Sequence, residues 1–469
     1  MPRSATLSRW ASALALFSLQ AACDEDRPAS PAVPDVSPYV PIGRPVDPLV
    51  DTPVLGPETG SDDAGSGGLD MAVDTPSSRF DMAPPRDAAP PDGPPPPPPP
   101  PLHLRFEPIV HDAPSLRATD LVFLPDTRDE LLILDKDGFI YHLRMDGDRA
   151  TTISSRPVLD TWFDSDAGAI SLALDPNFRD NRFFYVALTT SIERSVVRRY
   201  TFGVVDDGVD ILEVVGPRAP RSWHNVGSIG FDDTGALWGL FGDKVLWDVA
   251  HDPFSPLGAL LRVLPSRVPG LGGHTFPDDN AYAAGEGHPA VFAKGLRSPW
   301  KGLFVNGVYY FGDVGLETYE EVNRVDGPGL DFGWPAVEGP CREACADYEE
   351  PWLFYGRDGQ HRFVRDDALA TSSRLRSVYV GHAGVPRDQG DDPYEGRWSG
   401  VLTFGDMSVG FVRARRLDGG PDWHVGHLHW ATAWARGGDG FVYVTTLGTW
   451  PQDNPGVTQS RLVRAVLSD

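Results

Sequence analysis

The sequence lacks most features that would build a helical, membrane-spanning or zinc-clustered protein. Its 469 residues include 3 cysteines, and the two that lie outside the N-terminal region are too few for a structural zinc site. After the N-terminal region no apolar run approaches the length of a membrane span, and no stretch shows the periodicity of a long amphipathic helix. These absences favour an all-β domain outside the membrane.

Basic residues are also scarce. The chain has 41 Lys and Arg against 66 Asp and Glu, a net charge of −25. This balance argues against nucleic acid and against anionic lipid as partners. An acidic surface suits a soluble domain held away from a membrane, and solubility alone would also explain it.

Residues 1–22 have the pattern of a secretory signal, with two arginines, a mostly apolar run over residues 11–19 and small residues before Cys23. Residues 19–23 resemble a bacterial lipoprotein processing box, in which the cysteine is acylated and becomes the new N-terminus. Gln20 departs from that box, and cleavage without lipid is the alternative. We therefore expect export to the bacterial cell envelope, with Cys23 as a lipid anchor facing the periplasm or the outside.

Residues 23–101 form a predicted linker. They are rich in proline, alanine, aspartate and glycine, with almost no aromatic residues, so they cannot bury a core. The unbroken run Pro94–Pro101 predicts a stiff polyproline II spacer. Of the net charge of −25, the linker carries −10 and the signal +2, which leaves −17 for residues 102–469.

Residues 102–469 predict an all-β domain built from repeated hairpins. An apolar strand, an acidic or glycine turn and an aromatic-rich strand recur at residues 131–143, 229–241, 302–313 and 435–447. Asp-Gly and Asn-Gly turns are the strongest short-range hairpin signals. Repeated hairpins over this length favour a six-bladed β-propeller over a sandwich. Because a propeller gathers its loops at two mouths of one channel, site residues should come from different blades.

The segment Ser222–Asp243 carries the first candidate site. A strand, a turn at residues 232–235 and a return strand would bring Asp243 back beside His224. A carboxylate there would fix the tautomer of the imidazole and raise its basicity, which a proton-abstracting histidine needs. The alternative is a histidine that only caps a sheet edge.

Two further pairs of residues are candidates for a disulfide and for a metal site. Export past an oxidising compartment favours a disulfide between Cys341 and Cys345, once Cys23 is acylated. His427 and His429 would share one face of a strand, as a metal pair or as part of the channel mouth. No acid or cysteine sits at ligand spacing, so histidines packed beside neighbouring tryptophans are the favoured interpretation.

An ordered series of motifs supports a family resemblance. The motifs are Thr119–Asp126, Gly168–Tyr185, Leu257–Val263, Pro277–Asn280, Gly295–Pro299, Gly312–Gly315, Glu320–Asn323 and Asp331–Pro335. Together they resemble the glucose/sorbosone dehydrogenase family, six-bladed quinoproteins that use pyrroloquinoline quinone (PQQ) and calcium to oxidise aldose sugars. The resemblance covers nearly the whole of residues 102–469.

The resemblance implies roles for individual residues. His224 matches the general base that takes the proton of the anomeric hydroxyl, and Asp243 the carboxylate that orients it. Arg297 matches the arginine near the quinone carbonyl, where a fixed positive charge stabilises developing negative charge; a surface salt bridge is the alternative. Glu321 and the backbone carbonyl of Phe332 fall at calcium-ligand positions, whereas without a metal the glutamate would be an exposed strand-end charge.

Some cofactor positions depart from the family pattern. Asp166 stands where the family often has a glutamine that reaches the cofactor, and Ser298 replaces the asparagine after the arginine. Residues 377–384 offer no lysine for a cofactor carboxylate, although a trianionic cofactor needs several cations. A calcium-dependent lactonase-like hydrolase would need converging acidic or amide ligands that the sequence does not assemble.

These observations predict PQQ- and calcium-dependent oxidation of an aldose sugar or polyol in the cell envelope. The alternative is a propeller that has lost the cofactor and binds a saccharide or a protein partner. The spacing of His224 and Asp243, together with Arg297, favours the enzyme. The departures at Asp166 and Ser298 favour the binding module.

Overall fold

The computed structural model describes residues 100–113, 117–158, 160–217, 221–341, 345–357, 376–384, 392–448 and 461–468. The predictions for the secretory signal, for acylation of Cys23 and for residues 23–99 of the linker lie outside these residues. No helix in the described ranges is long and apolar enough to cross a membrane.

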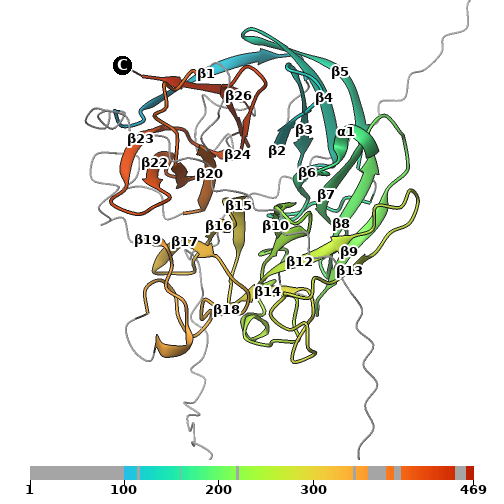
Figure 1. Cartoon of the computed structure of the whole chain (residues 1–469), viewed down its shortest axis with the longest axis vertical. Coiled ribbons are helices and arrows are strands. Elements are labelled where there is room, and N and C mark those ends of the chain that lie inside the picture. The colour runs from blue at the N-terminus through green and yellow to red at the C-terminus, as the bar shows by residue number, and fades with distance from the viewer. Residues whose placement is uncertain are drawn as a thin grey trace, which may run out of the picture. The chain divides into compact units, whose positions relative to one another are not determined.

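The described strands form six blades around a central axis, as the repeated hairpins predict (Figure 1). From the axis outward, the first blade contains β2 (Ala118–Phe123), β3 (Glu130–Asp135), β4 (Phe139–Asp146) and β5 (Arg149–Pro157). The second contains β6 (Ala169–Leu174), β7 (Phe183–Thr189), β8 (Arg194–Thr201) and β9 (Val209–Val215). The third contains β10 (Val226–Phe231), β11 (Leu237–Phe241), β12 (Ala259–Pro265) and β14 (Val291–Lys294), with the short strands β13 (His274–Thr275) and β18 (Leu330–Asp331) paired to β12 and β14.

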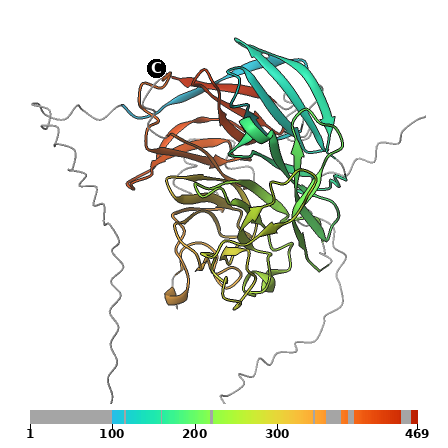
Figure 2. The ribbon, with the colours of Figure 1, turned by 45° about the vertical axis from the view of Figure 1, so that its right-hand side comes forward.

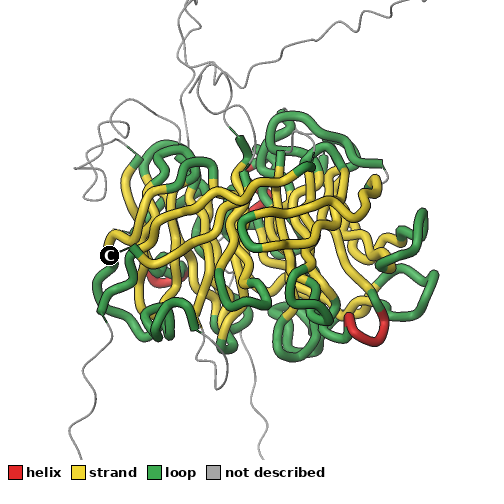
Figure 3. The backbone as a smooth tube through the Cα atoms, turned by 90° about the horizontal axis from the view of Figure 1, so that it is seen from above, coloured by secondary structure: helices red, strands yellow, loops and turns green. Residues whose placement is uncertain are grey.

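The remaining blades follow the same plan. The fourth contains β15 (Pro299–Val305), β16 (Val308–Asp313), β17 (Tyr319–Val325) and β19 (Leu353–Gly356). The fifth contains β20 (Val378–Gly384), β21 (Val401–Asp406), β22 (Phe411–Arg416) and β23 (Trp423–His427). The sixth contains β24 (Ala431–Arg436), β25 (Val442–Thr446), β26 (Leu462–Leu467) and β1 (Leu104–His111). Helical turns in the described ranges are short: α1 (Phe178–Asn181), η1 (Trp247–Ala250) and η2 (Cys345–Asp347). Figure 3 shows the strands filling the middle of the body and the loops gathered at its two ends.

The two ends of the propeller sequence meet in the sixth blade. β1 pairs antiparallel with β26, from Leu104 opposite Leu467 to Ile109 opposite Leu462, and the two strands lie side by side (Figure 1; Figure 2). The end of β1 also pairs parallel with β5 of the first blade. This pairing joins the sixth blade to the first in one eight-stranded sheet, so the ring is closed by backbone hydrogen bonds.

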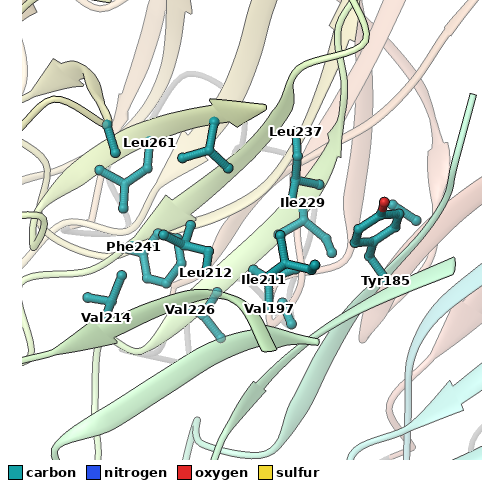
Figure 4. Close-up of a cluster of buried hydrophobic side chains, with 14 of the residues drawn as sticks. Tyr185, Val197, Ile211, Leu212, Val214, Val226, Ile229, Leu237, Phe241 and Leu261 are labelled. Atoms are coloured by element: carbon teal, nitrogen blue, oxygen red, sulfur yellow. The ribbon is translucent and has the colours of Figure 1, made fainter. Parts of the chain in front are cut away.

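Local sequence explains the strands. In the hairpin between β15 and β16, Asn306 and Gly307 have φ values of 52° and 80°, the left-handed conformation that a two-residue type I′ turn requires. Every residue of β7 is buried, because both faces of a blade pack against neighbouring blades. Figure 4 shows one such cluster, in which side chains of the second blade, such as Tyr185 and Leu212, meet those of the third, such as Ile229 and Phe241.

A buried lysine crosses the channel. Nζ of Lys301, on β15, donates hydrogen bonds to the backbone oxygens of Thr119 at 2.8 Å and Ile170 at 3.0 Å. These acceptors belong to the first and second blades, and the Asp120 carboxylate lies 3.7 Å from Nζ. Burial lowers the pKa of Lys301, and the charge of Asp120 opposes that shift. One side chain of the fourth blade thus holds two other blades across the axis.

The channel contains a cavity of about 390 Å³, lined by residues of all six innermost strands, Lys301 among them.

Replacing Lys301 with alanine should lower the free energy of unfolding by about 3–5 kcal/mol, because two buried carbonyl oxygens lose their donor and Asp120 loses its opposite charge. Urea denaturation at neutral pH measures the change. Arg416, paired with Asp418 at the surface, is the control, and its replacement by alanine should cost less than about 1 kcal/mol. Equal losses in the two variants would contradict a central role for the ammonium group.

Candidate functional site

The candidate site lies where the innermost strands begin. His224 precedes β10, and Asp243 follows β11, which pairs antiparallel with β10. Arg297 precedes β15 in the next blade, and its backbone oxygen accepts a 2.9 Å hydrogen bond from the amide of Asp243. The hairpin turn, strand pairing and blade packing therefore bring the three residues to one mouth of the channel.

His224 and Asp243 form the pair expected from the hairpin. Nδ1 of the imidazole lies 2.6 Å from Oδ1 of Asp243, and both side chains are buried. An ionised carboxylate only accepts hydrogen bonds, so Nδ1 carries the proton and Nε2 keeps its lone pair. No protein group in the described residues is hydrogen-bonded to Nε2. The pair has the geometry of an oriented general base.

Trp334 connects this pair to its surroundings. Its indole Nε1 donates a 2.8 Å hydrogen bond to Oδ2 of Asp243. The guanidinium of Arg297 lies over the Trp334 ring, 5.4 Å from its centroid, and the Trp247 ring packs against it at 5.8 Å. Trp334 belongs to the motif Asp331–Pro335, but the motif indicates no role for it, because its position beside Asp243 depends on a contact between distant segments.

The backbone at this mouth is strained. His224, Lys244, Val245 and Trp247 all have positive φ, between 41° and 60°. Each such residue costs about 1–3 kcal/mol, and strain of this kind concentrates at functional sites. The amide of Val245 donates to Oδ1 of Asp243 at 2.7 Å. The carboxylate that orients His224 therefore also holds the strained turn.

Asp166 supports His224 through the backbone. Its Oδ2 accepts a 2.7 Å hydrogen bond from the amide of His224, and the neighbouring Asp164 accepts one from the Ser222 hydroxyl. Burial lowers the pKa of Lys244 to about 8, and the charge of Asp166 opposes this shift. The structure thus places Asp166 as a positioning residue for His224, a contact that no sequence pattern signals.

Arg297 is buried, which excludes the alternative of a surface salt bridge. Its Nη1 donates to the backbone oxygens of Val314 and Gly315 at 2.7 and 2.8 Å. Its Nε is buried without a hydrogen-bond partner. Burial lowers the pKa of Arg297, and the charges of Asp243 and Asp313 oppose that shift. A buried guanidinium with an unused donor is suited to an anionic ligand.

Two further arginines, which no sequence motif marks, belong to the fourth and fifth blades. Arg357 follows β19 and forms an ion pair with the fully buried Glu320, and Arg376 precedes β20. Burial and the charges of Arg297 and Arg376 lower the pKa of Arg357 to about 10. The three guanidinium groups come from separate segments of the fourth and fifth blades, so their grouping became visible only in the fold.

The two predicted calcium ligands come from different segments, and their use by a metal stays a prediction. Glu321 lies on β17 and accepts a hydrogen bond from the amide of Gly339. Phe332 follows β18, and its amide donates to the Lys294 backbone oxygen at 3.0 Å. The described residues contain no cluster of three or more His, Cys, Asp or Glu side chains placed to hold a metal. Glu321 is nevertheless half-buried rather than an exposed strand-end charge.

Two carboxyl groups here have raised pKa values. Burial raises the pKa of Glu321 to about 8, with the charge of Asp313 as the second cause. Burial also raises the pKa of Asp313 to about 7, although its oxygens accept hydrogen bonds from the amides of Arg297 and Ser298. The backbone of Ser298 is thus held by Asp313. A hard cation beside these carboxylates would favour their charged forms.

The two other predicted pairs are a pair of cysteines and a pair of histidines. Cys341 is disulfide-bonded, and its pairing with Cys345 stays a prediction. The Nε2 atoms of His427 and His429 lie 2.9 Å apart, and Nδ1 of His429 lies 2.9 Å from the Ser408 backbone oxygen. The two imidazole rings therefore lie close together, and their interpretation as packed histidines stays a prediction.

The fold and the site define a class: a six-bladed propeller of sugar dehydrogenase type, with a histidine–aspartate pair and buried arginines at one channel mouth. A family model described as Glucose / Sorbosone dehydrogenase matches residues 116–350, half of the chain. The chain belongs to this family.

Solved structures share the fold. The putative oxidoreductase (glucose dehydrogenase) of Thermus thermophilus is 23% identical, with a TM-score of 0.57 over 77% of this chain and 100% of that one. The PQQ-bound aldose sugar dehydrogenase of Streptomyces coelicolor is 17% identical, with a TM-score of 0.58 over 79% and 100%. The apo-form of the soluble aldose sugar dehydrogenase of Escherichia coli is 18% identical, with a TM-score of 0.59 over 78% and 100%.

Curated relatives match a shorter part of the chain. The HIPL1 and HIPL2 proteins of Arabidopsis thaliana are 32% and 30% identical over 138 residues, which is 26% of this chain. The chain spans about a fifth of the length of these relatives, since the match covers 20% of each.

The raised pKa values predict a pH dependence of stability. Between the unfolded and folded pKa of Glu321, the folded chain holds a proton that the unfolded chain has lost, so stability falls as pH rises from about 4.5 to about 8. Glu321→Gln should reduce this slope by up to about 1.4 kcal/mol per pH unit. Urea denaturation across this pH range measures it. Glu317→Gln, at an exposed position, is the control, and identical slopes in wild type and Glu321→Gln would refute the prediction.

Proposed function

We propose that this protein is a PQQ- and calcium-dependent dehydrogenase that oxidises an aldose sugar or polyol. The observation that carries the proposal is the buried His224–Asp243 pair, 2.6 Å apart, with buried Arg297 at the same mouth. A histidine with its Nδ1 proton directed to a carboxylate is set up to accept a proton at Nε2.

The charges at the mouth fit a carboxylated quinone. The charges of Arg297 and Arg376 both act on Arg357, and these arginines would supply the positive charge that residues 377–384 do not offer. The Nε–H group of Arg297 has no acceptor in the described residues, so it can donate a hydrogen bond to a ligand. These arginines would hold the cofactor, and Asp313 and Glu321 would offer oxygen ligands to calcium.

The proposed chemistry divides between the cofactor and the chain. When bound, PQQ supplies the two-electron acceptor for oxidation of the sugar. His224 accepts the hydroxyl proton at Nε2, and Asp243 stabilises the resulting imidazolium while keeping its orientation. Arg297 contributes a fixed positive charge, buried where its field is little screened, toward negative charge that develops during the reaction.

A binding module without the cofactor is the second candidate. It is favoured by the engagement of site residues with one another: Asp166 accepts from the amide of His224, and Arg297 donates to two backbone oxygens. Such a propeller would hold a saccharide or a protein partner at the same mouth. In either case we propose export, with Cys23 as lipid anchor in the bacterial cell envelope.

The deciding experiment is titration of the purified mature chain with PQQ in calcium buffer, followed by addition of aldoses. We expect the quinone absorbance to saturate and then to bleach on addition of sugar. His224→Ala should retain quinone binding and slow bleaching roughly 10²–10⁴-fold, because the proton acceptor is lost. His424→Ala, on the outer strand β23, is the control.

Absence of quinone binding at high micromolar PQQ would refute the dehydrogenase and leave the binding module. Bleaching that survives unchanged in His224→Ala would retain an oxidoreductase but remove His224 as its base.

A further inference from the structure

Trp247 is an exposed aromatic side chain beside the candidate site. It is 44% exposed, whereas the other tryptophans of the described residues are buried or half-buried. It begins η1, immediately after the strained turn that follows Asp243. At a channel mouth, a partly exposed indole offers an apolar face that a ligand can cover.

Trp247 is connected to the candidate base by direct contacts. Its ring meets that of Trp334 edge to face, with centroids 5.8 Å apart and planes at 68°. Trp334 in turn donates a 2.8 Å hydrogen bond to Asp243. Buried Trp334 therefore packs against the Trp247 ring, and the exposed part of the Trp247 ring is open to solvent.

The backbone that presents this ring is strained. Val245 and Trp247 have φ values of 60° and 41°, and a left-handed conformation is a genuine outlier for a β-branched residue such as valine. The amide of Val245 is held by Asp243 at 2.7 Å. Exposure of a tryptophan and strain in its backbone both oppose stability, so their combination at the mouth indicates a functional constraint.

We propose that Trp247 is a stacking subsite for the pyranose ring of the substrate. One face of a pyranose presents C–H groups with partial positive charge, which are attracted to the electron-rich face of an indole. Acyclic polyols have no such flat face. The inference rests on the proposed function and narrows its substrate class to cyclic aldoses, free or at the end of an oligosaccharide.

The first test is steady-state oxidation by the PQQ-loaded mature chain, with glucose, maltose and sorbitol. Trp247→Leu keeps apolar bulk but removes the aromatic face, and it should raise KM about tenfold for glucose and maltose while kcat changes less than twofold. KM for sorbitol should not change. Trp247→Phe should restore most of the affinity for the two aldoses. Phe354→Ala, at an exposed aromatic residue on outer strand β19, is the control and should match wild type.

A second test does not need turnover. Quenching of tryptophan fluorescence by glucose or maltose, measured without PQQ, should saturate in wild type and in His224→Ala and disappear in Trp247→Leu. If this pattern holds while no oxidation occurs with any sugar, the subsite stands and the proposed dehydrogenase fails. If oxidation occurs but Trp247→Leu keeps the wild-type KM for glucose and maltose, the dehydrogenase stands and the subsite is refuted. Absence of saturable quenching in wild type also refutes the subsite.

Discussion

A buried ammonium group at the axis holds the centre of this propeller together. Lys301 of the fourth blade donates to backbone oxygens of the first and second blades, whereas strand pairing connects residues within each sheet. Burying a lysine is costly unless polar groups surround it, and the carbonyls and Asp120 provide that surrounding.

The other lysines likewise donate hydrogen bonds to the backbone of other segments. The chain contains four, at positions 136, 244, 294 and 301, and each ammonium donates to a backbone oxygen of another segment. Lys244 joins the third blade to the second, and Lys136 joins the first blade to the segment before β6. Buried arginines such as Arg297 also donate to backbone oxygens, and the lysine ammonium differs from them in being a compact point charge.

The fold and the pairing of His224 with Asp243 could be predicted because they depend on local sequence. Hairpin turns and alternating apolar residues specify the blades, and a single hairpin brings Asp243 beside His224. The contacts of Trp334, Arg357 and Arg376 depend on packing between blades, which no local pattern encodes. The role of Asp166 could not be predicted for another reason. Asp166 accepts a hydrogen bond from the amide of His224, and the backbone of His224 is in a left-handed conformation. A sequence does not show φ.

Asp243 connects the candidate base, the strained turn and Trp334 through hydrogen bonds. Its two oxygens accept from the imidazole of His224, the amide of Val245 and the indole of Trp334. The carboxylate therefore sets the tautomer of the candidate base, fixes the strained turn that presents Trp247 and fixes the ring that supports it. In the proposed roles of His224 and Trp247, proton transfer and substrate placement depend on one buried group, so a change at Asp243 should disturb both together, whereas a change at Trp247 should disturb placement alone. That asymmetry follows from the hydrogen bonds and does not depend on which cofactor the mouth holds.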